Sequence, residues 1–122
     1  MNSKRSWVII SGALGFLGVV LGAFGAHWLK NVITREMLEV YQTGILYHLI
    51  HTAVLLAIST HWEDKLKNAS LFFLAGIILF SFSLYFYAFS GIHMLVYITP
   101  VGGLSFLAGW ILVITAAFKN ND

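Results

Sequence analysis

Histidines and tyrosines recur at helical spacing in the second apolar stretch of the chain. Tyr41, Gly44, His48 and His51 follow one another at intervals of three and four residues, and Tyr47 borders the same stripe. One helix face would therefore carry two imidazoles and up to two phenols. Inside a membrane such groups are expensive, and they tend to face the protein interior or a water-filled cavity.

This pattern supports more than one chemistry. Imidazoles relay protons and bind metals or haem, and a mixed His/Tyr face suits a polar solute. Equally, neutral histidines bonded to hydroxyls or backbone carbonyls of neighbouring helices are structural links. His27, at the end of the first apolar stretch, is a further weak metal candidate beside His48 and His51. A His-x-x-His pair falls short of the three or four ligands of a metal site, so no cofactor is expected.

A polar cavity is the main alternative to structural histidines. Ser81 and Tyr85 share one face of the third apolar stretch, and Thr99 precedes Pro100 at the start of the fourth. Small solutes or protons would then permeate through an outward-facing cavity. Its expected lining is Tyr41, Tyr47, His48, His51, Tyr85 and Thr99.

Four apolar stretches must position these residues. They cover residues 7–29, 40–60, 69–91 and 96–118 of a chain of 122 residues, of which 59% are hydrophobic and 10% charged. Each is long enough to cross a bilayer core of about 30 Å as a helix. The connections are short, so successive helices should be antiparallel neighbours. We expect an all-α fold, a single membrane domain over residues 1–122 built as an up-down four-helix bundle.

Small residues lie at helical spacing in two of the stretches. The first glycine stripe is Gly15, Gly18, Gly22 and Gly25, and the second small-residue stripe is Gly102, Ser105 and Gly109. Glycine weakens a helix in water, but in lipid small residues let a second helix approach closely. Both stripes predict intimate helix packing, within one chain or between chains.

Charges flank the stretches unevenly. Five basic residues lie on the side of the termini and the 61–68 loop, and two lie on the other: Lys4, Arg5, Lys65, Lys67 and Lys119 against Lys30 and Arg35. The positive-inside rule then places both termini in the cytoplasm. The 31–39 segment is expected to form a short surface helix capped by Thr34. Pro100 is expected in the first turn of the last helix, and the alternative is a distorted opening over residues 99–103 that exposes backbone to a cavity.

The residue types that are missing from the chain argue against several classes of function. There is no cysteine, and the four stretches contain no Asp, Glu, Lys or Arg. Embedded carboxylates for proton-coupled export or hydrolysis are therefore missing. The net charge of +2 is too small to indicate nucleic-acid binding. A non-enzymatic structural or interaction bundle is favoured, with the bilayer and a second copy or another membrane protein as partners.

Five motifs in order carry a family resemblance. They are Gly22-Ala-Phe-Gly-Ala-His27, Tyr41-Gln-Thr-Gly-Ile-Leu-Tyr-His-Leu-Ile-His51, Leu79-Phe-Ser-Phe-Ser-Leu-Tyr85, Ile98-Thr-Pro-Val-Gly-Gly103 and Gly109-Trp110. Together they resemble the small membrane proteins grouped as domain of unknown function 423, or uncharacterised protein family 0382. The resemblance implies a bacterial cytoplasmic-membrane protein with four spans, and it supplies no mechanism.

Overall fold

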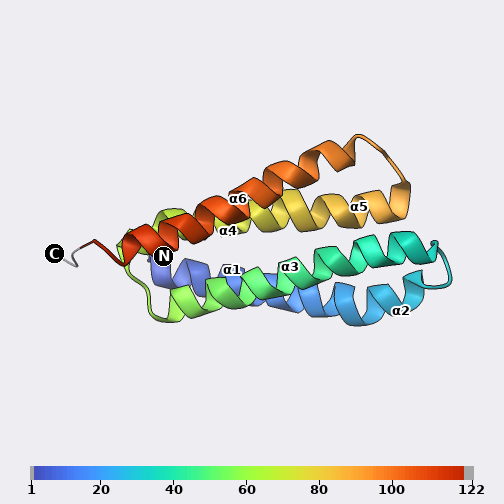
Figure 1. The fold of residues 1–122 in the computed structure, drawn as a ribbon. Coiled ribbons are helices and arrows are strands. Elements are labelled where there is room, and N and C mark those ends of the chain that lie inside the picture. Colours follow the sequence, from blue (N-terminus) through green and yellow to red (C-terminus); the bar gives the residue numbers. More distant parts are fainter. Residues whose placement is uncertain (1, 120–122) are drawn as a thin grey trace.

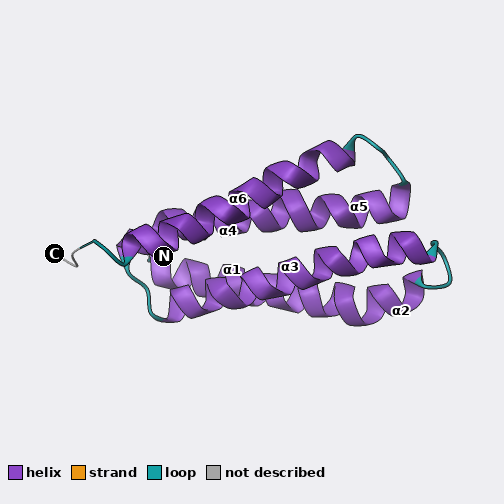
Figure 2. Cartoon of the chain, viewed as in Figure 1, coloured by secondary structure: helices purple, strands orange, loops and turns teal. Residues whose placement is uncertain are grey.

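The computed structural model describes residues 2–119, and these form four long helical segments (Figures 1 and 2). The first segment joins α1 (Ser3–Val19), η1 (Val20–Gly25) and α2 (Ala26–Leu29), and the second is α3 (Arg35–Thr60). The third joins η2 (Asp64–Leu66), α4 (Lys67–Gly76), η3 (Ile77–Phe82) and α5 (Ser83–Ser90). The fourth is α6 (Leu95–Ala116). All four segments are long and apolar enough to cross a membrane, which confirms the all-α, four-span prediction.

The helix ends follow from local chemistry. Asn2 caps α1 by accepting a hydrogen bond from the Arg5 amide at 2.8 Å. Gly91 ends α5 with φ of 71°, a left-handed conformation that glycine adopts without steric cost. Thr34 accepts from the Met37 amide at 3.2 Å, so it caps α3 itself. The prediction of a separate surface helix at 31–39 was therefore wrong, because residues from Arg35 onward are the continuous first turns of α3.

Pro100 lies inside α6, five residues after the helix begins at Leu95, so its expected place in the first turn was also wrong. Proline has no amide hydrogen and leaves one carbonyl of the preceding turn without its usual donor. The carbonyl that loses its donor is that of Val96, and Thr99 Oγ1 donates to the Leu95 carbonyl beside it at 3.3 Å.

Successive segments fold back beside one another, and the two middle segments hold the interior (Figure 1). The closely packed pairs are α1 with α3, α3 with the third segment, and the third segment with α6. A larger share of residues is buried in the second and third segments than in the first and fourth. The first segment and α6 therefore form the outer edges, and most of their surface is left to the bilayer.

Two short π-helical stretches interrupt the first and third segments, and the sequence pattern did not predict them. They are η1, which contains Gly22 and Gly25, and η3, which contains Ser81. Each adds a residue to a turn and changes which side chains and carbonyls face the neighbouring helix. The Leu21 carbonyl in η1 accepts both from the Ala26 amide and from a side chain of α3.

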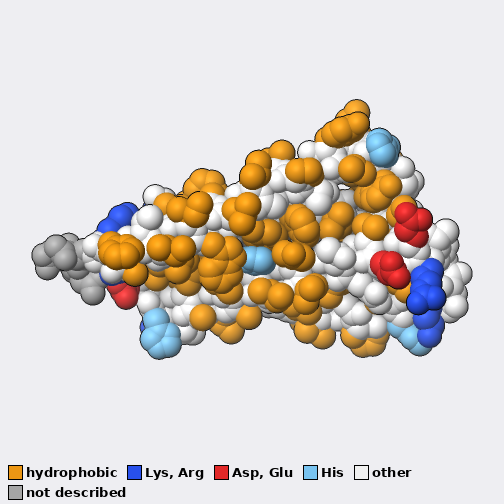
Figure 3. Space-filling model, viewed as in Figure 1, with side chains coloured by type: hydrophobic (Ala, Val, Ile, Leu, Met, Phe, Trp, Pro, Cys, Tyr) orange, Lys and Arg blue, Asp and Glu red, His pale blue; other side chains and the backbone are white. Residues whose placement is uncertain are grey.

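Charged side chains gather at the two ends of the molecule, and apolar side chains cover the middle of the face in view (Figure 3). This distribution is what a bilayer requires, with ionised groups in the headgroup regions and hydrocarbon around the centre. The two basic groups predicted from the sequence accordingly lie at opposite ends of the four segments.

Candidate functional site

His48 is fully buried between the first and third segments. Its Nε2 lies 2.9 Å from the backbone carbonyl of Leu14, and its Nδ1 lies 2.8 Å from the Tyr85 hydroxyl. A carbonyl only accepts, so Nε2 must carry a proton and donate it. In the neutral ring Nδ1 then accepts from Tyr85. Both ring nitrogens are thus used by partners within the chain.

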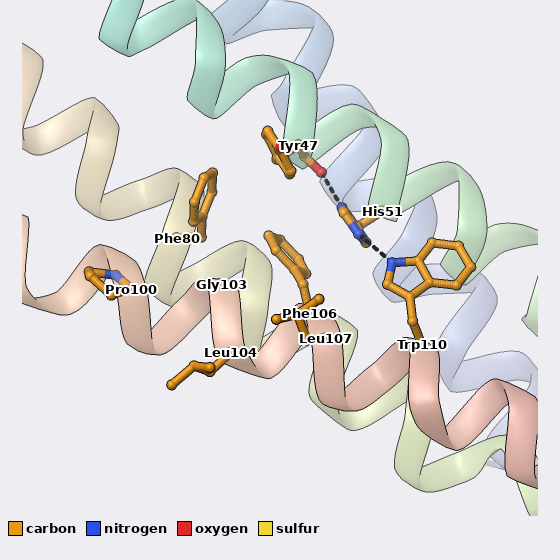
Figure 4. Close-up of a pocket in the computed structure, with 9 residues that line it drawn as sticks. All are labelled: Tyr47, His51, Phe80, Pro100, Gly103, Leu104, Phe106, Leu107 and Trp110. Atoms are coloured by element: carbon orange, nitrogen blue, oxygen red, sulfur yellow. Dashed lines mark hydrogen bonds between the residues drawn. The ribbon is translucent and has the colours of Figure 1, made fainter.

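His51 lies one helical turn further along α3 and has different neighbours. Its Nδ1 donates to the backbone carbonyl of Tyr47 at 2.8 Å. Its Nε2 lies 3.1 Å from Nε1 of Trp110, and an indole nitrogen only donates. Nε2 must therefore be unprotonated, so this histidine is neutral. The ring stacks on Phe106 with centroids 3.8 Å apart (Figure 4).

The two histidines consequently hold opposite tautomers. His48 carries its proton on Nε2 and His51 carries its proton on Nδ1, each assigned from partners that have only one role. Their spacing of three residues puts both rings on the buried side of α3, as predicted. However, His48 reaches α1 and α5, whereas His51 reaches α6. They are two separate links between helices.

Tyr41 forms a third link, between α3 and η1. Its hydroxyl donates to the Leu21 carbonyl at 2.5 Å, and its ring lies against Tyr85 with centroids 5.1 Å apart. Tyr41, His48 and Tyr85 therefore form one buried network that joins α3 to the first and third segments. Two buried hydroxyls, on Thr52 and Ser81, have no partner among the described residues.

The six residues expected to line one polar cavity are placed in different surroundings within the described part of the chain. Tyr41, His48 and Tyr85 lie in the buried network, and Thr99 pairs with Ser83 through hydroxyls 2.6 Å apart. Tyr47 and His51 alone border an open groove. The physical reason is that α3 contacts different helices on adjacent sides, so residues spaced by three or four separate into different interfaces.

The structure of residues 2–119 contains no assembled metal site. No group of three or more His, Cys, Asp or Glu side chains is placed to hold an ion there. His27 is exposed at the end of the first segment and is not brought together with His48 and His51. A metal or haem at either buried histidine would have to displace a partner that now bonds the ring.

A lateral groove opens between α3, η3 and α6 (Figure 4). Its volume is about 520 Å³. The rings of Tyr47, Phe80 and Phe106 point toward one another around it, and α6 supplies most of the remaining lining. The full lining, hereafter the lateral groove, is Tyr47, His51, Phe80, Pro100, Gly103, Leu104, Phe106, Leu107 and Trp110.

The first glycine stripe faces α3 of the same chain. A Cβ added at Gly18 would lie 2.5 Å from Leu49 Cδ2 and 3.2 Å from Nε2 of His48. A Cβ at Gly22 would lie 3.1 Å from Ile45, and one at Gly25 would collide with the Tyr41 hydroxyl. At Gly15 the nearest atom is 3.7 Å away, an ordinary contact. Glycine is thus needed where Tyr41 and His48 reach carbonyls of the first segment.

The second small-residue stripe faces the third segment. A Cβ at Gly102 would collide with the backbone of Phe80, and one at Gly109 would lie 2.6 Å from the Phe73 ring. Ser105 donates to the Phe72 carbonyl at 2.7 Å. Both stripes are therefore covered by helices of the same chain, and the sequence alone had left this open.

Some important residues were missed by sequence reasoning. Trp110 was noted only as part of a motif, although a tryptophan well inside an apolar span needs a partner for its N–H. The need of the indole N–H for an acceptor could therefore have marked Trp110 as a candidate in the sequence. The carbonyls of Leu14 and Leu21 could not be predicted as partners, because every backbone carbonyl can accept a hydrogen bond. Gly44, which admits the Tyr85 ring at 2.7 Å from an added Cβ, was seen only as part of the polar stripe.

Four apolar helical segments with charges at their ends and polar links inside define a multi-pass α-helical membrane protein. The chain belongs to the family described as "Protein of unknown function (DUF423)", which matches residues 21–103. This confirms the resemblance drawn from the five motifs.

Curated relatives carry the same kind of name. The "UPF0382 membrane protein" of Haemophilus influenzae is 38% identical and covers 98% of both chains. The "UPF0382 inner membrane protein YgdD" of Escherichia coli K12 is 36% identical over 96% of this chain and 92% of its own. The "UPF0382 membrane protein YwdK" of Bacillus subtilis is 42% identical over 94% and 98%. No solved structure matches the chain.

Proposed function

We propose that this protein is a non-enzymatic structural or interaction bundle of the bacterial cytoplasmic membrane. The observation that carries the proposal is the state of the two buried histidines. Every ring nitrogen of His48 and His51 is bonded within the chain. Groups that must bind a substrate or exchange protons with solvent would need at least one free nitrogen.

The hydrogen-bond directions also argue against a proton path. The proton of His48 ends on the Leu14 carbonyl, and that of His51 ends on the Tyr47 carbonyl. A peptide carbonyl accepts a hydrogen bond but does not pass a proton on, so both chains of bonds stop there. This favours structural histidines over the permeation alternative.

The glycine stripes support a rigid, self-contained bundle. Gly18 and Gly25 admit side chains of α3 that bond to the first segment, and Gly102 admits the backbone of the third segment. In lipid, such close packing and interhelical hydrogen bonds are the main sources of helix association. Association with a second copy or another membrane protein would then use other surfaces, such as the exposed outer faces of α1 and α6.

Orientation is part of the proposal. Both termini and the 61–68 loop are assigned to the cytoplasm because they carry five of the seven basic residues. The names of the relatives, which include an inner membrane protein, support a cytoplasmic-membrane location.

A transport assay tests the proposal. Purified protein in liposomes with an entrapped pH dye should dissipate a proton gradient no faster than empty vesicles, and small-solute swelling assays should match the same blank. A protein-dependent flux that is lost in His48→Ala or His51→Ala would overturn the proposal. A flux retained in both variants would also do so, with the path placed elsewhere.

A further inference from the structure

We propose that the lateral groove binds a quinone dissolved in the bilayer, with its ring among the aromatic walls and a ring oxygen accepting a hydrogen bond from Tyr47. This goes beyond the bundle proposed above and does not depend on it. It requires only binding, with no electron transfer. The volume of about 520 Å³ lies in the range of about 300–1,000 Å³ typical of small-molecule sites.

Tyr47 supplies the polar group that needs a partner. Its hydroxyl makes no hydrogen bond with any described residue, and Tyr47, which lines the groove, is 39% exposed as a residue. Tyr47 lies midway along α3 (Arg35–Thr60), about 18 Å from either end at the usual helical rise. An unpaired hydroxyl in hydrocarbon costs about 2–7 kcal/mol on transfer scales, so a partner at that depth is strongly favoured.

The depth of Tyr47 narrows the chemistry of that partner. Phospholipid oxygens lie in the headgroup regions, which flank a hydrocarbon core of about 30 Å, and are out of reach from its centre. The ligand must therefore carry its oxygen into the hydrocarbon. A lipophilic quinone does this, because its carbonyl oxygens sit on a ring that enters the bilayer together with its apolar tail.

The groove walls suit a flat ring. The rings of Phe80 and Tyr47 lie 4.7 Å apart between centroids in a tilted arrangement, and both side chains are partly exposed. Phe106 lies 5.6 Å from Phe80 and is itself buried, with its ring stacked on His51, so it forms the floor of the groove. Aromatic side chains gain most from offset stacked or edge-on contact with another ring. A saturated acyl chain would fill the space without using this geometry or the Tyr47 hydroxyl.

Gly103 keeps the groove open. A Cβ at Gly103 would meet only Phe80 Cδ2 at 3.8 Å, so protein packing does not require glycine there. The neighbouring Gly102 is different, because its Cβ would strike the Phe80 backbone. Glycine weakens a helix relative to alanine by about 1 kcal/mol, and at Gly103 the evident result of its presence is space in the groove.

Photolabelling tests the proposal. The full chain in phosphatidylcholine nanodiscs is labelled with an azido-ubiquinone, with and without excess unlabelled ubiquinone, and the labelled peptides are mapped by mass spectrometry. We expect competable labelling within residues 100–110 and around Tyr47. Tyr47→Phe should weaken competition by about five- to tenfold, as for one lost hydrogen bond. Gly103→Leu should abolish the labelling by filling the groove.

Control variants distinguish a bound quinone from other molecules that could occupy the groove. Gly12→Leu, at a glycine with no heavy atom within 4 Å of an added Cβ, should label like the wild type. Labelling that unlabelled ubiquinone does not compete, or that Tyr47→Phe leaves unchanged, would overturn the proposal in favour of ordinary lipid. A dimer in native mass spectrometry that Gly103→Leu dissociates would overturn it in favour of a second copy. If Gly103→Leu fails to fold, Tyr47→Phe still decides.

Discussion

The indole N–H of Trp110 donates to Nε2 of His51 across 3.1 Å, and this bond determines the protonation state of the histidine. The indole cannot accept, so a proton on Nε2 would face a second donor. The bond also joins α6 to α3, two segments whose backbones are not among the closely packed pairs. Trp110 therefore holds an outer helix to the centre of the bundle.

Replacing Trp110 should test that link. Trp110→Phe leaves His51 Nε2 without its donor in a buried position, so the free energy of unfolding should fall by about 1–3 kcal/mol. Thermal melting in detergent measures this. Trp28→Phe is the control, because Trp28 is exposed and its ring stacks on that of Phe89. Equal melting temperatures for the two variants would contradict the structural role of the Trp110 bond.

The Tyr85 hydroxyl should matter more than its neighbour Ser81. Tyr85→Phe deprives Nδ1 of His48 of its donor and should lower the free energy of unfolding by about 1–3 kcal/mol. Ser81→Ala removes a buried hydroxyl that has no hydrogen-bond partner within residues 2–119 and should change stability little. Denaturation of both variants under the same conditions compares their free energies of unfolding. A larger loss of stability in Ser81→Ala than in Tyr85→Phe would show that Ser81 has a partner of its own.

Two adjacent glycines should respond oppositely to alanine. Gly102→Ala places a Cβ against the backbone of Phe80 and should force α6 away from the third segment, with a clear loss of melting temperature. Gly103→Ala meets only an ordinary contact and should be neutral, or more stable by up to about 1 kcal/mol from helix propensity. Matching losses in both variants would mean that α6 packs differently.

The orientation of the chain is open to direct measurement, because the sequence contains no cysteine. Single cysteines at Asn2 and Lys67 should react with an impermeant thiol reagent only after the cytoplasmic side is exposed. Those at Asn31 and His93 should react in intact cells. The reverse pattern would place the termini outside and contradict the orientation drawn from the basic residues.

The spans were predictable because the length of each apolar stretch and the absence of charged residues from it can be read from the sequence. The glycine stripes were also visible, since their spacing matches the helical repeat and close approach needs small residues. The hydrogen-bond partners of the buried histidines and tyrosines could not be predicted from the sequence. Whether His48 meets a carbonyl of α1 or a cavity depends on the rotation of each helix, and the π-helical turns at η1 and η3 change that rotation locally.

The errors have a common physical origin. The cap at Thr34 was predicted correctly, and the error was to assign it to a separate surface helix. Pro100 was judged from a local preference, which favours proline at helix starts. In the structure the helices are longer: α3 starts directly after Thr34, and α6 continues through Pro100. Inside a bilayer an unsatisfied backbone group is costly, which favours a helix that continues through Pro100.

The protonation of the two buried histidines shows whether they are structural links between helices. Nitrogen-15 solid-state NMR on histidine-labelled protein in bilayers, assigned with His48→Gln and His51→Gln, reports which ring nitrogen carries the proton. We expect two neutral rings with opposite tautomers, Nε2–H at His48 and Nδ1–H at His51, neither in contact with water. Matching tautomers, a charged ring or cross-peaks to mobile water would contradict structural histidines and return the protein to the class of permeation pathways.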